Sequence, residues 1–146
     1  MMLRSLAIAL LLVAGATHAG DATKIVATGG WVRVLPGSLP AGGYLTFENR
    51  SDRAVSIVGA QSPQYADAMI HRSSTDGGMG RMEMVDSVAV PANGKLVFGP
   101  GGYHVMLMQP KHAVKPGDTV TVTFTLSDGA SIPATLVARP ANATGL

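Results

Sequence analysis

The sequence predicts an all-β fold, a single-domain antiparallel β-sandwich. Short apolar runs separated by turn-forming residues recur from end to end, and no window supports a long amphipathic helix. Residues 119–126, TVTVTFTL, alternate threonine with apolar side chains, which is typical of a strand with one buried and one solvated face. Many short strands with regular turns indicate an antiparallel sandwich or barrel, and 146 residues suit one domain.

The predicted strands follow one another from residue 24 onward. The first two runs, 24–28 and 31–34, flank Gly29-Gly30. The other runs occupy residues 43–49, 54–60, 67–73, 80–90, 95–100, 102–108, 118–126 and 131–138. Turn chemistry separates them, as in PANG at 91–94 and LSDGAS at 126–131. The last residues, PANATGL at 140–146, are expected to be frayed.

The first 19 residues have the features of a secretory signal peptide. Arg4 supplies the positive charge, residues 5–16 form the apolar stretch, and Thr17-His18-Ala19 forms a small-x-small cleavage site. The alternative is a membrane anchor, but the apolar stretch falls short of the roughly 20 residues that span a bilayer. We expect cleavage after Ala19, which leaves residues 20–146 as an exported domain without a membrane span.

Charge and cysteine content exclude several classes of protein. Without Arg4, ten basic residues face nine acidic ones, a balance that gives no indication of a nucleic-acid partner. The chain has no cysteine, so the core must hold the exported fold without disulfides. The same absence excludes thiolate metal sites and thiol catalysis. No G-x-S-x-G nucleophile elbow occurs either, and we expect a protein that is not an enzyme.

Methionine is concentrated in one window of the mature chain. Six methionines, at positions 69, 79, 82, 84, 106 and 108, lie between residues 69 and 108, together with His71 and His104. Methionine that only fills gaps in a core would be scattered over every strand. The predicted strands outside the window use Val, Ile, Leu and Phe instead. The clustering therefore indicates a function for these side chains.

The spacing within the window is more specific than the clustering. His71 is expected to end one strand, and Met82 lies on the next strand after a glycine-rich connection, so the two can face each other across a hairpin. His104 and Met106 share one face of a third strand because side chains alternate. Two histidines and two methionines from three segments can thus converge in the pattern H-x10-M-x21-H-x-M.

Thioether sulfur and imidazole together suit Cu(I), a soft ion that accepts tetrahedral geometry. Zinc favours thiolate, imidazole and carboxylate ligands, and calcium and magnesium need oxygen ligands. A blue-copper site requires a cysteine thiolate and is excluded. Within the set, Met79 and Met84 are candidates to replace Met82. The competing interpretation is that these methionines only pack a core, in an adhesion or scaffolding sandwich.

At these residues the sequence resembles the periplasmic copper chaperones of the PCu(A)C family. The resemblance rests on the complete H-x10-M-x21-H-x-M motif, on GPGGYHVMLM at 99–108, on WVR at 31–33 and on AGGYLTFEN at 41–49. It implies a cupredoxin-like β-sandwich in the periplasm that binds one Cu(I) through His71, Met82, His104 and Met106. It also implies delivery toward the dinuclear copper centre of cytochrome c oxidase, by contact with that subunit or with another copper assembly protein.

Two further functions stay open from the sequence. A periplasmic copper buffer or tolerance protein would hold the same ion without a dedicated recipient. The scaffolding sandwich would not bind Cu(I) at all. We expect the protein to be a monomer, as a copper chaperone or in either alternative function. The C-terminal histidine- and methionine-rich extension of some PCu(A)C proteins has no counterpart in the final residues given, ARPANATGL, so a role that depends on it is not expected.

Overall fold

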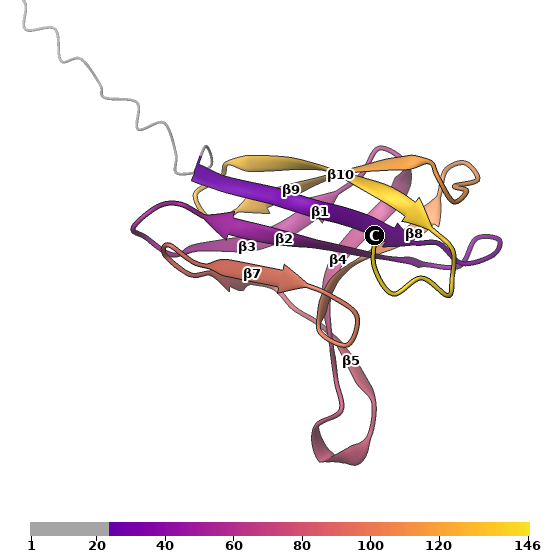
Figure 1. Cartoon of the computed structure of the whole chain (residues 1–146), viewed down its shortest axis with the longest axis horizontal. Coiled ribbons are helices and arrows are strands. Elements are labelled where there is room, and N and C mark those ends of the chain that lie inside the picture. The colour runs from indigo at the N-terminus through magenta and orange to yellow at the C-terminus, as the bar shows by residue number, and fades with distance from the viewer. Residues whose placement is uncertain (1–23) are drawn as a thin grey trace, which may run out of the picture.

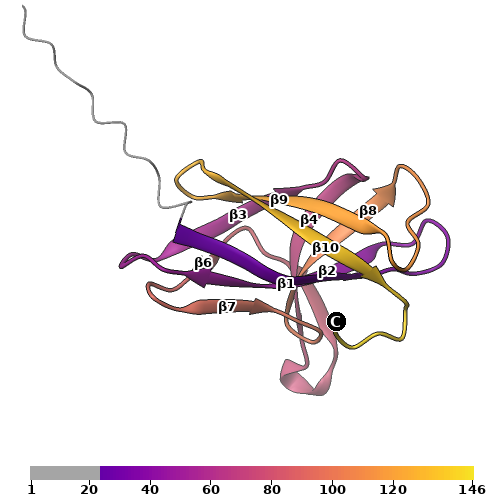
Figure 2. The ribbon, with the colours of Figure 1, turned by 45° about the horizontal axis from the view of Figure 1, so that its top comes forward.

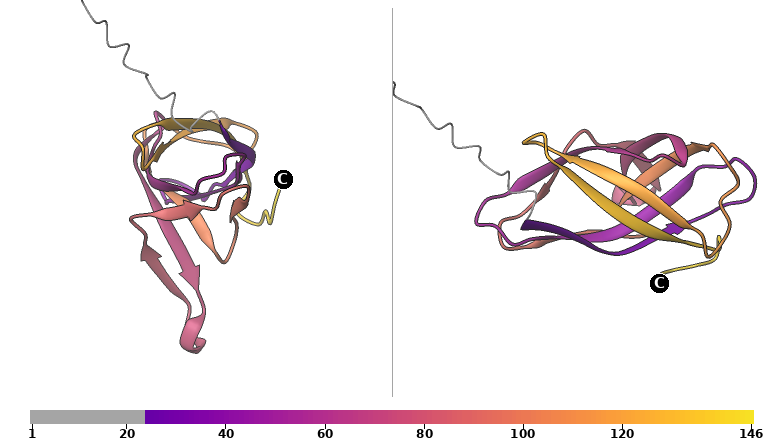
Figure 3. Two further views of the ribbon diagram at one scale, coloured as in Figure 1. Left: turned by 90° about the vertical axis from the view of Figure 1, so that its left-hand side faces the viewer. Right: turned by 90° about the horizontal axis from the view of Figure 1, so that it is seen from above.

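A single curled sheet of ten strands encloses the core of the protein. The computed structural model describes residues 24–146, so the predicted signal peptide, residues 1–19, lies outside the described residues. The strands are β1 (Ile25–Arg33), β2 (Ala41–Asn49), β3 (Val55–Gln61), β4 (Tyr65–Ser74), β5 (Arg81–Met84), β6 (Val88–Val90), β7 (Lys95–Phe98), β8 (Tyr103–Pro110), β9 (Thr119–Leu126) and β10 (Ser131–Arg139). Figure 3 shows the strands wrapping around a common interior. The all-β, single-domain prediction is confirmed.

The strand order is β5-β4-β8-β2-β1-β10-β9-β3-β6. Strand β7 pairs with β2 beyond the stretch that pairs with β8 (Figure 2). Every pair is antiparallel except β1 with β10, which run parallel. The sheet is therefore mixed, because the first and last strands of the fold lie side by side and run in the same direction.

The core consists of branched aliphatic and aromatic side chains from nearly all strands. Phe47, Phe98 and Phe124 meet edge to face at its centre, with ring centroids 4.9–6.2 Å apart, an arrangement that aromatic rings favour. None of the six methionines in residues 24–146 is among the buried core side chains. The fold therefore does not need these methionines for its interior. Outside the methionine window, the strands bury Val, Ile, Leu and Phe, as the sequence predicted.

Three of the predicted runs are joined or divided differently in the structure. The runs 24–28 and 31–34 form one strand, β1, with a register shift between Thr28 and Trp31. Gly29 makes this bulge with a φ of 66°, a left-handed conformation that glycine adopts without steric cost. The run 80–90 instead divides into β5, which pairs with β4, and β6, which pairs with β3.

The hairpin of β4 and β5 extends beyond the body of the sheet. Its far end, with the short 3-10 turn η2 (Asp76–Gly78), projects away from the other strands (Figure 1; Figure 3, left). All four residues of β5 are exposed. The root of the hairpin is fixed to the body, since the Ser73 amide donates to the Gly102 carbonyl at 3.0 Å and the Val85 amide to the Ile70 carbonyl at 2.9 Å. Within residues 24–146, no helix has the length and apolarity needed to cross a bilayer.

Gly43 is predicted to be essential for the packing of β2 against the core. A Cβ at Gly43 would lie 2.5 Å from Val105 Cγ1 and 2.9 Å from Leu136 Cδ2, so Gly43→Ala should destabilise the fold by about 1–3 kcal/mol through overpacking. Gly59→Ala is the matched control, because its Cβ would come no closer than 3.8 Å to its neighbours. Urea denaturation should place the control within about 1 kcal/mol of the wild type; similar curves for the two variants would contradict the packing argument.

Candidate metal centre

The two histidines of the sequence motif lie directly opposite each other on neighbouring strands. The antiparallel register of β4 and β8 pairs His71 with His104, and their rings meet edge to face with centroids 5.7 Å apart. Both lie on the outer face of the sheet, whereas Ile70 and Val105, one position away on each strand, point into the core. Alternation therefore gives these strands a core face and a separate face that carries the histidines.

One backbone carbonyl orients the His104 ring. The Nδ1 atom of His104 lies 3.2 Å from the Gly102 carbonyl oxygen, and because that oxygen has no proton to give, Nδ1 donates. In the neutral ring the proton is then on Nδ1, which leaves Nε2 with a free lone pair. This Nε2 is buried and has no hydrogen-bond partner, and the same holds for Nδ1 of His71. Buried polar atoms without partners are costly, and imidazole nitrogens are common metal ligands, so these two atoms are candidates for that role.

Burial also keeps His104 neutral. The side chain is 4% exposed, and the loss of hydration lowers the pKa of His104 below its ordinary value of 6.5. The hydrogen bond to Gly102 opposes this shift, while the nearby His71 lowers the pKa further because two imidazolium charges repel each other. A neutral imidazole is the form that binds a metal ion.

Three of the four residues in the sequence motif line one pocket. Met82, His104 and Met106 border a half-open cavity of about 250 Å³, together with Tyr44, Ser73 and Arg33. His71 is not part of this lining but lies beside His104. The structure thus brings three of the four predicted residues to one pocket, with His104 and Met106 on the body of the sheet and Met82 on the projecting hairpin, where it is 55% exposed.

The hairpin register differs from the one the sequence indicated. His71 lies three residues before the end of β4, and Met84, not Met82, is its cross-strand partner; Met82 pairs with Ser73. Met82 nevertheless lines the pocket with His104, whereas Met84 lines a different pocket with Met69. Met79 lies outside the strands, after η2, and is exposed.

Sequence reasoning missed a group of residues near His104, of which Arg33 and Tyr44 also line the pocket. Trp31 and Tyr44 are buried, but they belong to the outer face and not to the core cluster. Their rings lie 4.6 Å apart, and Tyr44 lies 6.2 Å from the His104 ring. The guanidinium of Arg33 sits 5.5 Å from both aromatic centroids. The only sequence signal was the alternation of side chains along a strand. It places Trp31 and Arg33 on one face of β1, and Gly42 and Tyr44 on one face of β2.

The C-terminal segment 140–146, which the sequence predicted to be frayed, is bound next to this group at Ala143. Nε and Nη2 of Arg33 donate to the Ala143 carbonyl oxygen at 3.1 and 2.8 Å. These bonds involve a charged donor and are stronger than neutral ones. Arg33 therefore connects the C-terminal segment to the aromatic pair of Trp31 and Tyr44. This pair shields one side of His104 from water.

The donors at this site are soft or borderline and carry no charge. Two thioether sulfurs and two imidazole nitrogens suit a soft monovalent metal ion, with His71, Met82, His104 and Met106 as the residues able to hold it. Within residues 24–146, no group of three or more His, Asp or Glu side chains is placed to hold a metal. Arg33 also lines the pocket and adds a positive charge, so the attraction for a cation must come from the neutral sulfur and nitrogen donors.

Comparison with known proteins places the chain in a family. Residues 25–138 match the family described as "Putative lipoprotein LpqE-like". The chain belongs to this LpqE-like family. Among curated proteins, the chain is similar to the "Putative lipoprotein Lxx21020" of Leifsonia xyli, with 30% identity over 104 residues, which cover 70% of this chain and 62% of that protein. An uncharacterised Rickettsia prowazekii protein, RP573, is 30% identical over 86 residues, covering 58% of this chain and 48% of that protein. The chain therefore spans about half to three fifths of the length of these relatives.

Solved structures confirm the predicted resemblance to PCu(A)C proteins. The LpqE-like chain is similar to the Cu(I) form of DR1885 from Deinococcus radiodurans, with 34% identity, a TM-score of 0.62 and coverage of 78% of this chain and 76% of that one. It has the fold of the copper-bound PCuAC domain of PmoF2, with a TM-score of 0.66 at 20% identity over 80% of this chain and 93% of that domain. The family and the fold of the prediction are both confirmed.

The lowered pKa of His104 predicts that the metal-free LpqE-like protein loses stability in mild acid. Below about pH 6.5 the unfolded chain binds a proton at this histidine while the folded protein resists it, so the free energy of unfolding falls as pH drops from 6.5 toward the folded pKa. Urea denaturation of metal-free protein between pH 7.5 and 5 should show this loss. His104→Gln should reduce it, whereas His112→Gln, at an exposed loop position, should not. Equal losses in both variants would assign the effect to other groups.

Proposed function

We propose that this LpqE-like protein is a periplasmic copper carrier that binds one Cu(I) through His71, Met82, His104 and Met106. The carrier delivers the ion toward the dinuclear copper centre of cytochrome c oxidase, to that subunit or to another copper assembly protein, and it has no enzymatic role. Copper is cargo here, not a resident cofactor. The observation that carries the proposal is the pair of buried histidine nitrogens without hydrogen-bond partners, on facing strands and beside two thioethers.

The similarity to a protein whose Cu(I) form has been solved supports this choice of metal. The residue types support it independently, since thioethers favour Cu(I) over Zn(II). An exported location is supported by the signal-like residues 1–19 and by the lipoprotein description of the family. The absence of cysteine fits an oxidising compartment, because a thioether cannot form a disulfide.

The division of ligands between a rigid body and a projecting hairpin supports a carrier. His104 is fixed by burial and by the Gly102 carbonyl, so one ligand remains in place while the ion is held. Met82 lies on an exposed strand and contributes a neutral donor that binds copper less tightly than a thiolate. A recipient with cysteine ligands can displace Met82 first and then take the ion by stepwise exchange. No change in the oxidation state of copper is needed.

A Cu(I) competition titration should show one tightly bound ion and little competition by Zn(II). Loss of a residue that only supports a ligand already lowers metal affinity by about 10–100-fold, so loss of a buried ligand in His104→Ala should reach at least the upper end of that range. Met82→Leu should weaken binding less, because Met79 and Met84 lie on the same hairpin. Met79→Leu is the control and should bind as the wild type does. Unchanged affinity in His104→Ala, or equal competition by zinc, would remove the proposed site.

A transfer assay separates a carrier from a buffer. The Cu(I)-loaded protein, mixed with the soluble copper-binding domain of a cytochrome oxidase subunit, should lose its ion faster than free dissociation into a chelator allows. Such acceleration requires a ternary complex, in which the recipient replaces ligands one at a time. A transfer rate that equals the dissociation rate at every recipient concentration would favour the copper buffer without a dedicated recipient.

A further inference from the structure

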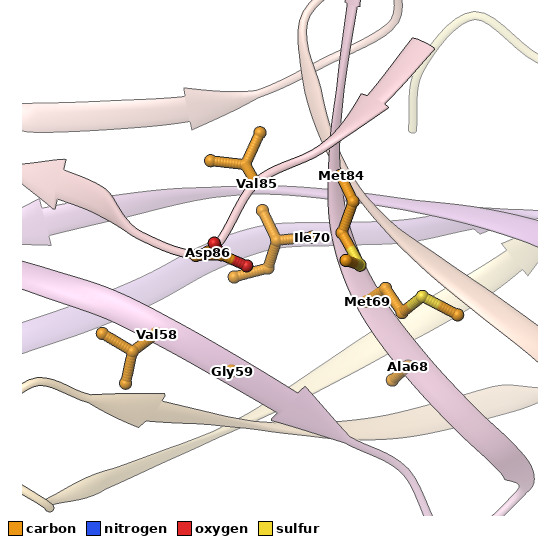
Figure 4. A pocket seen from close by; sticks show the side chains of 8 residues that line it. All are labelled: Val58, Gly59, Ala68, Met69, Ile70, Met84, Val85 and Asp86. Carbon is orange, nitrogen blue, oxygen red and sulfur yellow. The ribbon is translucent and has the colours of Figure 1, made fainter.

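Two methionines that the proposed copper site does not use lie together in a second pocket. Met69 on β4 and Met84 on β5 line a cavity of about 280 Å³ beside the hairpin root. Figure 4 shows the Met84 side chain extending toward Met69 at one side of this cavity. The rest of the lining is mainly apolar and includes Val58, Ala68, Ile70 and Val85, with the carboxylate of Asp86 at the opposite side.

This methionine pair is adjacent to His71. Met84 is the cross-strand partner of His71, and Met69 precedes His71 by two residues on the same face of β4. On the other side of β4, His71 pairs with His104 and Met69 pairs with Met106. His71 therefore adjoins Met84 on one side and His104 on the other, and its buried Nδ1 has no hydrogen-bond partner.

Packing explains this pair poorly. Met84 is 65% exposed, so most of its thioether side chain faces solvent and gains little from burial. Neither methionine belongs to the core cluster. An exposed position on a short strand would ordinarily carry a polar or β-branched residue. Two neutral sulfur atoms at an open, mainly apolar pocket with one carboxylate nearby instead match the needs of a soft monovalent cation.

We propose that Met69 and Met84, with His71 as a shared ligand, form a second and weaker Cu(I) position next to the primary site. This inference rests on the proposed function. Copper moves between the two positions by ligand exchange: bonds from Cu(I) to His104, Met106 and Met82 form as those to Met84 and Met69 break, while His71 stays bound. The ion remains monovalent throughout, so no oxidant or reductant takes part, and the exposed Met84 serves as the entry point.

The test follows the methyl groups of all methionines in the protein by 13C NMR. The probe is Ag(I), a redox-inert soft monovalent ion, with Cu(I) under reducing conditions for comparison. The first equivalent should shift the Met82 and Met106 methyl signals. When His71 already holds the first ion, a second equivalent has only Met69 and Met84 to bind, so it should bind at least about tenfold more weakly and shift the Met69 and Met84 methyl signals. The double variant Met69→Leu/Met84→Leu should lose the second binding event and keep the first.

Met79→Leu is the matched control, because Met79 is an exposed methionine next to the hairpin turn η2, outside both pockets. Met-to-Leu changes conserve volume and should cost less than about 1.5 kcal/mol, and amide chemical shifts of the metal-free variants show that the fold is kept. A second equivalent that shifts only Met79, or no second event, overturns the second position and leaves the primary site intact. A first equivalent that leaves Met82 and Met106 unshifted overturns the ligand set of the proposed function itself.

Discussion

The register of β4 against β8 is the constraint on which the rest of the site depends. Antiparallel pairing places His71 directly opposite His104 and Met69 opposite Met106, so both histidines and two of the thioethers share one face. If the pairing register of these strands shifted by one residue, the histidines would move into the core and Val105 would move to solvent, because successive side chains point to opposite faces. The buried Ile70, Val105 and Leu107 oppose such a shift, and the hydrophobic core thus sets the position of a site that lies outside it.

The Gly102 carbonyl joins this register to the chemistry of the ring. It accepts from the Ser73 amide and from Nδ1 of His104, and so connects the root of the hairpin, the β7–β8 turn and the histidine. One consequence is the choice of tautomer, which leaves Nε2 free. Another is that Met82 and His104, which are far apart in the sequence, are tied to one small region of backbone, although Met82 itself lies on an exposed strand.

The outer face of the sheet divides into a rigid half and an exposed half. On one side of His104, Tyr44, Trp31 and Arg33 stack in succession, and Arg33 binds the Ala143 carbonyl. On the other side, Met82 and Met84 project with the hairpin and are mostly exposed. His104 therefore lies between a buried aromatic pair and a solvent-exposed strand that carries Met82 and Met84.

The sequence by itself determined everything that depends on local periodicity and residue type. Alternation in GYHVMLM placed His104 and Met106 on one face and Val105 and Leu107 on the other, and the absence of cysteine with clustered methionine identified a soft donor set. Only the tertiary structure decided which strands are neighbours and in what register. It made Met84 the partner of His71, placed Trp31, Arg33 and Tyr44 beside His104, and set β1 parallel to β10. The physical reason is that a period of two specifies a face, whereas neighbours and register follow from long-range packing of core side chains that no local pattern contains.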